Sequence, residues 1–374
     1  MWKMRLHIGL DDTDSPKGGC TTYIGALLVE KLLAMGVEFI DYPNLIRLNP
    51  NAPWKTRGNG AISLRIQCPA EALDEIEETV FEAVEENSDL DCSNTNPGAV
   101  VYKGEVPLAF KEFSKRAITS IVELNEAARL IKRFKASALG LKNGRGLIGA
   151  LAAIGETLVG DHTYEFLAYR APENRGGKRR VDAESIFKMD EATTPLTFNN
   201  VDPQSSRVLI TPHGPDPILF GVRGETAEAV YEASQMVVVE EPIERWVIYR
   251  TNQGTDAHFA AVKQIADIKP FHPAVVENTV LKKPETIKGG HVILQVGDES
   301  GVIDCAAYEP TKSFRKVVKD LIPGDLVRIY GGVKQHATTL NMEKLEVRRL
   351  TPKVVYENPL CPRCGSRMEA MGRE

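Results

Sequence analysis

Three carboxylates, Asp11, Asp12 and Asp14, stand within four positions directly after the apolar run Leu6–Leu10. Repulsion makes such crowding costly unless a cation neutralises it, and carboxylate oxygens suit Mg²⁺ held together with substrate phosphates. The following segment, Gly18–Thr22, predicts a helix start whose backbone N–H groups attract an anion. The alternative is a hydrophilic turn that caps the helix. The pattern favours a metal–phosphate site, with metal at Asp11 and Asp12.

A basic, glycine-containing turn between two strand candidates holds Arg47, Lys55, Arg57 and Asn59. From such a turn the side chains can reach across the end of a sheet toward the acidic loop. There the cations would neutralise a transferring phosphoryl group, and all four are predicted as nucleotide-binding residues. The alternative is a solvated basic turn without a ligand. The neighbouring carboxylates favour the phosphate-binding interpretation.

Two further loops are candidates for ligand binding. Lys142–Gly146 precedes a helix of small residues, and such glycine-rich turns either bind phosphate or allow close helix packing. The proline-rich segment Thr211–Pro217 holds His213 and Asp216 rigidly. A rigid aspartate suits a cationic ligand, whereas the alternative is a structural turn.

Near the end of the sequence, Cys361 and Cys364 have the spacing of a zinc knuckle. A closed structural zinc site requires four ligands, so this pair is a half-site. We expect the chain to stop inside a zinc ribbon that binds Zn²⁺ in the full-length protein. The alternative is two incidental cysteines.

The elements that position these residues fall into three groups. Strand candidates near 6–10, 44–48 and 61–66 alternate with helices at about 21–36 and 70–87, which predicts an α+β domain. Residues 117–160 are predicted to be mainly helical. They are followed by a second α+β unit with strands near 164–169, 208–210, 218–222 and 246–250. Short strands between 275 and 342, with one helix at about 312–320, predict a small barrel of the OB type.

The composition predicts a multidomain globular protein. The chain has 374 residues, of which 43% are hydrophobic and 26% charged, which suggests about two to four domains. Apolar runs are too short for a membrane span, and the N-terminus enters a strand at once, so a cytoplasmic protein is expected. A monomer is expected because several domains of one chain can span a large nucleic acid. A net charge of −5 argues against a protein that merely coats nucleic acid, although the basic stretch 111–145 could face a polyanion.

Five segments in order resemble the archaeal 2-agmatinylcytidine synthetases that act on the minor isoleucine tRNA. They are Gly9–Ser15, Gly19–Tyr23, Ile46–Pro50, Lys55–Gly60 and Thr211–Gly224. The resemblance runs from end to end and departs only where the second half of the zinc ribbon is expected. It implies a kinase-like ATP/Mg²⁺ domain at 1–120, a ferredoxin-like domain at 121–265, an OB-fold domain at 275–350 and a truncated zinc ribbon at 355–374.

The resemblance also implies a reaction. Members of this family use ATP to activate the 2-carbonyl oxygen of the wobble cytidine, and agmatine then displaces the activating group, so that the tRNA reads AUA. In the family a threonine is autophosphorylated, and it corresponds to Thr21 here. Agmatine would dock in the second domain, where Asp216 and His213 are the candidates for contact. Two rival hypotheses are a non-catalytic RNA-binding protein and a different ATP-dependent enzyme, such as a small-molecule kinase.

Overall fold

The computed structural model describes residues 3–259, 261–262, 264–335, 339–354 and 357–369. Over these residues the chain forms two compact units, one built mainly from residues up to 261 and the other mainly from residues after 275. No helix within the described ranges has the length and apolar character that a membrane crossing requires. The mixed α/β multidomain architecture agrees with the prediction from sequence.

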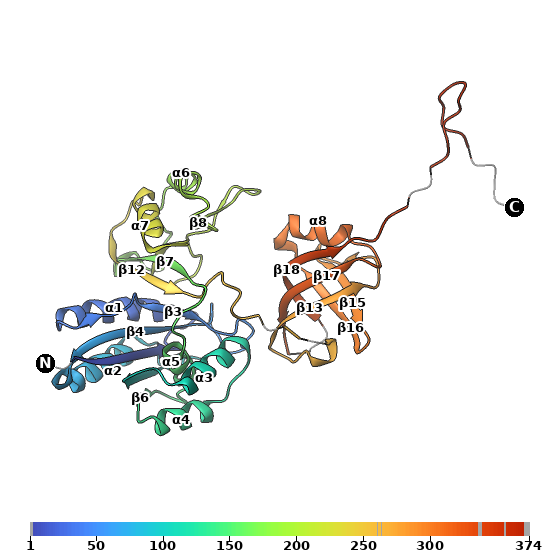
Figure 1. The fold of residues 1–374 in the computed structure, drawn as a ribbon. Coiled ribbons are helices and arrows are strands. Elements are labelled where there is room, and N and C mark those ends of the chain that lie inside the picture. Colours follow the sequence, from blue (N-terminus) through green and yellow to red (C-terminus); the bar gives the residue numbers. More distant parts are fainter. Residues whose placement is uncertain (1–2, 260, 263, 336–338, 355–356, 370–374) are drawn as a thin grey trace. The chain divides into compact units, whose positions relative to one another are not determined.

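The first unit is organised around one sheet. Its N-terminal half consists of β1 (Lys3–Asp11), β2 (Glu38–Phe39), β3 (Asn44–Arg47), β4 (Gly60–Pro69), β5 (Gly98–Lys103) and β6 (Ser137–Gly140). Its C-terminal half consists of β7 (Thr163–Arg170), β8 (Thr197–Phe198), β11 (Ile218–Gly224) and β12 (Ile243–Thr251). The ten strands have the order β6-β5-β1-β4-β3-β12-β7-β11-β8, with β2 paired to β4 (Figure 1).

The two halves join where β3 and β12 pair in parallel, with Leu45 opposite Thr251. The side chain of Asn252 strengthens this junction. Its Oδ1 accepts the backbone N–H of Arg47 at 2.7 Å, and its Nδ2 donates to the Arg47 carbonyl at 3.0 Å. A single hydrogen-bonded sheet therefore connects residues that lie about 200 positions apart in the chain.

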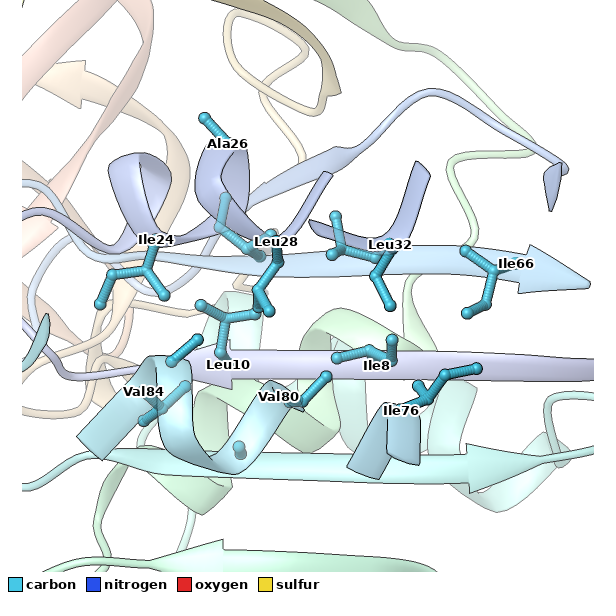
Figure 2. Close-up of a cluster of buried hydrophobic side chains, with 14 of the residues drawn as sticks. Ile8, Leu10, Ile24, Ala26, Leu28, Leu32, Ile66, Ile76, Val80 and Val84 are labelled. Atoms are coloured by element: carbon cyan, nitrogen blue, oxygen red, sulfur yellow. The ribbon is translucent and has the colours of Figure 1, made fainter. Parts of the chain in front are cut away.

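Helices cover both faces of the N-terminal half: α1 (Thr21–Ala34) and α2 (Leu73–Asn87) on one, and α3 (Leu108–Thr119), α4 (Leu124–Arg133) and α5 (Gly146–Gly155) on the other. Figure 2 shows Ile24, Leu28 and Leu32 of α1 packed with Ile8 and Leu10 of β1. Their spacing is that of one helix face and one strand face. Because both faces of β1 are covered, its end is held in a rigid environment.

The C-terminal half carries helices α6 (Ala183–Thr193) and α7 (Ala227–Met236) over the cluster around Phe166 and Phe220. A small hairpin of β9 (Val201–Asp202) and β10 (Arg207–Val208) lies beside them. The strands run β12-β7-β11-β8 across the sheet, and each neighbouring pair is antiparallel.

The second unit is a barrel, as predicted. Its elements are β13 (Pro273–Val280), β14 (Glu285–Thr286), β15 (Val292–Asp298), β16 (Gly301–Ala307), α8 (Ser313–Asp320), β17 (Leu326–Val333) and β18 (Thr339–Arg349). The strand path β13-β17-β18-β16-β15 closes through pairing of β13 with β15. Helix α8 lies between β16 and β17 in the chain, in agreement with the prediction. Because the path closes, the described strands of the barrel have no long unpaired edge.

Several elements were not predicted from sequence, among them β5, β6 and α6. Residues 137–140, within the stretch predicted as mainly helical, form β6, whose four residues are partly buried and exposed in alternation but form too short a run to predict a strand. Strand β5 and helix α6 were also missed. The signal for α6 was present, because the Asp182 carboxylate caps the helix by accepting the N–H groups of Glu184 and Ser185.

Candidate active site

The loop between β1 and α1 brings the three predicted carboxylates to the end of the sheet. Asp11 is the last residue of β1, which pairs with β4 on one side and β5 on the other. Asp12 has a φ of 61°, a left-handed conformation that aspartate adopts more readily than most residues. The turn redirects the chain toward α1 and leaves the carboxylates beside the buried strand end.

All three carboxylates line one pocket on the side of α3 and α5. Lys55 and Asn59, both predicted as nucleotide-binding residues, also line it. Apolar contributions come from Leu48, Ile121, Val122 and the half-exposed Trp54. Such a mixture of apolar walls with a few charged groups is typical of small-molecule sites and suits a nucleotide.

Arg145 lines this pocket and lies in the candidate loop Lys142–Gly146, but it was not itself predicted as a site residue. Its Nη2 lies 2.7 Å from Asp12 Oδ2, and its Nη1 donates to Asn94 Oδ1 at 3.2 Å. The sequence signal was an arginine immediately before the small-residue helix α5, in a loop noted only for its glycines. These contacts fix the guanidinium group of Arg145 in the pocket. Because Arg145 and Asp12 lie far apart in sequence, their contact could not be predicted from their positions in the chain.

Arg57 contacts the acidic loop and is not among the described residues that line the pocket. Its Nη2 lies 2.9 Å from Asp14 Oδ2 and donates to the Gly19 carbonyl at 2.7 Å, while Nη1 donates to the Ser15 carbonyl at 3.1 Å. One guanidinium thus ties together both ends of the loop. The prediction that Arg57 approaches the acidic loop agrees with this geometry.

Asp11 is packed against the start of α5. A Cβ atom at Gly149 would lie 1.9 Å from Asp11 Oδ2, and one at Gly146 would lie 2.5 Å from the Asp11 carbonyl oxygen. Of the two interpretations left open for this glycine-rich turn, the geometry supports close packing at these two positions. Glycine is required there because the helix backbone touches the strand end.

Burial raises the pKa of all three carboxyl groups. Burial and then the charge of Asp12 raise the pKa of Asp11 well above its usual value. Burial raises the pKa of Asp12 to about 6 although Arg145 opposes the shift, and burial raises the pKa of Asp14 against the effect of Arg57. Carboxyl groups with raised pKa values that share one pocket make that pocket a candidate functional site. A bound cation would offset the repulsion between their negative charges.

We expect Asp11→Asn to stabilise the ligand-free protein while removing its activity. Burial disfavours the ionised form of Asp11 in the folded state, so Asp11 ionises at a lower pH in the unfolded chain. The free energy of unfolding therefore falls as the pH rises above about 4, the usual pKa of an aspartate. The gain should be about 0.5–2 kcal/mol near pH 7, and it should vanish near pH 4. Urea unfolding across this pH range measures it.

The exposed Glu82 on α2 provides the control, because Glu82→Gln should leave the unfolding free energy unchanged at each pH. A loss of stability in Asp11→Asn at pH 7 would contradict the electrostatic description of the loop.

Arg47 is placed differently from the prediction. Among the described residues it lies outside the pocket lining, and its Nη2 contacts Glu165 Oε2 at 3.1 Å. Leu45 faces the α1 side of the sheet and Ile46 the α5 side, so Arg47 points back to the α1 side. Strand alternation therefore separates Arg47 from Lys55, although the two lie close in sequence.

Thr21 is buried at the first position of α1. Its hydroxyl lies 3.0 Å from the hydroxyl of Thr13 in the acidic loop. Thr21 is thus joined directly to the loop that carries the carboxylates, although it is not among the described residues that line the pocket.

Asp216 and His213 do not converge on one ligand position. The buried Asp216 carboxylate lies 3.3 Å from Arg179 Nη2, and its charge raises the pKa of Asp14 as the last of several causes, after burial. His213 instead lies on the surface with its Nε2 at 2.6 Å from Arg207 Nη2. Of the two predicted agmatine contacts, Asp216 is the one near the acidic loop, and it already has a cationic partner.

The two C-terminal cysteines lie in a tight turn. The Cys361 N–H donates to the Ser366 carbonyl at 2.8 Å, and the Gly365 N–H donates to the Cys361 carbonyl at 2.9 Å. Hydrogen bonds from Ser366 and from the Cys361 thiol lower the pKa of Cys364. In the predicted ribbon, residues 355–356 and 370–374 lie outside the described residues. Within the described ones, no group of three or more His, Cys, Asp or Glu side chains could hold a metal.

The carboxylate-lined α+β unit and the closed barrel define a class of multidomain proteins that carry an OB-fold nucleic acid binding domain. That domain family matches residues 275–349. The TiaS TCKD domain matches residues 7–143, and the TiaS FLD domain matches residues 144–258. The chain belongs to the TiaS family.

Individual members are similar over nearly the whole chain. The isoleucine tRNA 2-agmatinylcytidine synthetase TiaS of Pyrococcus horikoshii is 47% identical, across 99% of this chain and 87% of that protein. A crystal structure of apo TiaS has a TM-score of 0.91 at 41% identity, covering 99% of this chain and 87% of that one. A crystal structure of TiaS in complex with the isoleucine tRNA, AMPCPP and agmatine has a TM-score of 0.88 at 39% identity, covering 99% and 88%.

Proposed function

We propose that this protein uses ATP to join agmatine to the wobble cytidine of the minor isoleucine tRNA, as a cytoplasmic monomer. The observation that carries the proposal is the similarity to an isoleucine tRNA 2-agmatinylcytidine synthetase across 99% of the chain. A similar solved complex contains the isoleucine tRNA, the ATP analogue AMPCPP and agmatine, the three partners that the sequence predicts. The product, 2-agmatinylcytidine, lets the tRNA read AUA.

The reaction has two steps. First, O2 of the cytosine attacks phosphorus of ATP, so that an O–P bond forms while the bond to the nucleotide leaving group breaks. Second, the primary amine of agmatine attacks C2, the C2–O2 bond breaks, phosphate leaves and the new nitrogen loses a proton. Lys55 and Arg145 line the pocket and stabilise charge on the transferred group. Asp12 lies in the same pocket, where its carboxylate pairs with Arg145.

Asp11 and Asp12 are the proposed ligands for Mg²⁺. When bound, the ion neutralises phosphate oxygens of the nucleotide. Mg²⁺ typically takes only one or two carboxylates and completes its shell with water and phosphate, so two side chains suffice. Both carboxylates line the pocket at the end of β1, and this proximity supports the assignment.

The proposed domains are kinase-like at 1–120, ferredoxin-like at 121–265, OB-fold at 275–350 and zinc ribbon at 355–374. The chain order β7-α6-β8-β11-α7-β12 with its antiparallel sheet order supports the ferredoxin-like assignment. Ile121, Val122 and Arg145 line the nucleotide pocket because the segment from α4 to α5 packs on the N-terminal half of the sheet. Cys361 and Cys364 supply half of the ligands of a zinc site.

Thr21 is the proposed phosphoryl acceptor, and its hydrogen bond to Thr13 supports a role linked to the acidic loop. The proximity of Asp216 to that loop supports a place for the agmatine guanidinium there, with His213 farther away. Such a guanidinium would have to displace or share the Arg179 contact.

Calorimetric titration of the protein with ATP tests the nucleotide site. Wild-type protein is expected to bind ATP in the presence of Mg²⁺, and Asp12→Asn is expected to abolish this binding, because the variant removes both a metal ligand and the Arg145 partner. EDTA should have the same effect on the wild type. Wild-type protein that fails to bind ATP would contradict an ATP-dependent reaction and favour the RNA-binding alternative.

A further inference from the structure

Arg47, Glu165 and Arg223 form a charged cluster that the proposed chemistry does not use. Glu165 Oε2 lies 3.1 Å from Arg47 Nη2, and Glu165 Oε1 lies 3.1 Å from Arg223 Nε. The carboxylate side chain is 5% exposed, whereas those of Arg47 and Arg223 are 29% and 35% exposed. A buried anion thus holds two cations whose outer parts face solvent.

The cluster carries a net charge of +1. Burial would raise the pKa of Glu165, but Arg223 and Arg47 together lower it, so the carboxylate stays ionised. One carboxylate cannot use all the N–H donors of two guanidinium groups. Arg47 Nε is buried and has no hydrogen-bond partner among the described residues, which leaves a donor that calls for an acceptor.

The cluster and the nucleotide pocket lie on opposite faces of the sheet. Leu167 and Tyr169 of β7 belong to the core on the α1 side, so Glu165 faces that side too. The pocket is lined by Ile148 and Gly149 of α5, on the other side. The cluster is therefore reached from the face opposite the pocket, although Gly58 and Gly60, which line the pocket, also lie against Arg47 Nη1.

Glycines in the turn before β4 and at its first residue make room for the cluster. A Cβ atom at Gly58 would lie 3.1 Å from Arg47 Nη1, and one at Gly60 would lie 3.3 Å from it. The same turn carries Arg57, which ties the acidic loop together. The guanidinium of Arg47 thus lies directly beside the segment that shapes the active site.

We propose that Arg47 and Arg223, braced by Glu165, bind a backbone phosphate of the tRNA strand that delivers the target cytidine. The inference rests on the proposed function. Arginine pairs match the geometry of phosphate oxygens, and phosphate contacts fix the register of a nucleic acid without reading its sequence. Bound on the side of the sheet away from ATP, the strand would be held while its cytidine turns toward the carboxylates.

The salt dependence of binding tests this proposal. Affinity of the full chain for a transcript of the minor isoleucine tRNA is measured between low and physiological salt for wild type, Arg47→Ala, Arg223→Ala and Arg223→Lys. Losing one phosphate contact should reduce the slope of log affinity against log salt by about 0.7–0.9. Each alanine variant should show this loss and bind about tenfold more weakly at low salt, whereas Arg223→Lys should retain most of the slope.

The exposed Lys103 at the far end of β5 gives a control, because Lys103→Ala removes one positive charge away from the cluster and should keep the wild-type slope. ATP affinity should be unchanged in Arg47→Ala and Arg223→Ala. A wild-type slope in both variants, or weaker ATP binding with an unchanged slope, would overturn the proposal. Wild-type protein without affinity for the minor isoleucine tRNA would instead contradict the proposed function itself.

Discussion

Replacing Arg145 by alanine is expected to lower kcat/KM for agmatine transfer by about 10²- to 10³-fold, the range found when one fixed charge-stabilising donor is removed. Arg145 is held by Asp12 at 2.7 Å and by Asn94 at 3.2 Å, so its charge is fixed within the pocket before any ligand binds. Steady-state kinetics with saturating isoleucine tRNA measure the effect. The loss should fall mainly on kcat, because charge develops during phosphoryl transfer.

Two further variants test whether the fall in kcat/KM depends on the guanidinium group at position 145. Arg145→Lys keeps the charge but cannot reach both Asp12 and Asn94, so it should recover only part of the activity. Arg129→Ala should behave as wild type. If Arg145→Ala kept kcat/KM within about threefold of wild type, the assignment of Arg145 to the reaction centre would be wrong.

The largest expected effect on stability comes from the ion pair between Arg170 of β7 and Glu241. Two N–H groups of Arg170 lie 2.7 and 2.8 Å from the two carboxylate oxygens, and the side chains are only 2% and 1% exposed. Arg170→Met leaves a buried carboxylate without this partner, which typically costs about 3–5 kcal/mol. For a unit of this size that corresponds to a fall in Tm of about 6–20 °C.

Calorimetry of Arg170→Met beside the double variant Arg170→Met/Glu241→Leu separates the lost pair from the stranded charge. The double variant should recover much of the stability, because neither buried charge remains. Lys188→Ala, which removes an exposed pair with Glu184, should leave Tm unchanged. Equal losses in the single and double variants would show that packing, not charge, stabilises this position.

The sequence predicted the elements whose patterns are long and regular. Helix α1 follows from Ile24, Leu28 and Leu32 at helical spacing, and the barrel follows from its alternating strands around α8. Strand β6 could not be predicted, because its four residues acquire strand conformation only by pairing with β5. Short edge strands depend on tertiary contacts that no local pattern records.

In the site too, features set by local sequence could be predicted, whereas features set by tertiary contacts could not. The acidic loop could be predicted because its crowded carboxylates are anomalous within a few residues of sequence. Arg145 could not, because it meets Asp12 only after α5 packs on β1. Arg47 was grouped with Lys55 by proximity in sequence, whereas strand alternation sends it to the opposite face and toward Glu165. Contacts between residues that a sheet and its helices bring together from distant parts of the chain cannot be predicted from their spacing in sequence.

Mass spectrometry of the modified nucleoside tests the central claim most directly. The protein is incubated with ATP, Mg²⁺, agmatine and a transcript of the minor isoleucine tRNA, and the RNA is then digested to nucleosides. We predict a cytidine carrying one agmatine, located at the wobble position, formed only when ATP and agmatine are both present and lost in a transcript with uridine at that position. Turnover of ATP without tRNA and without agmatine in the RNA would contradict the account.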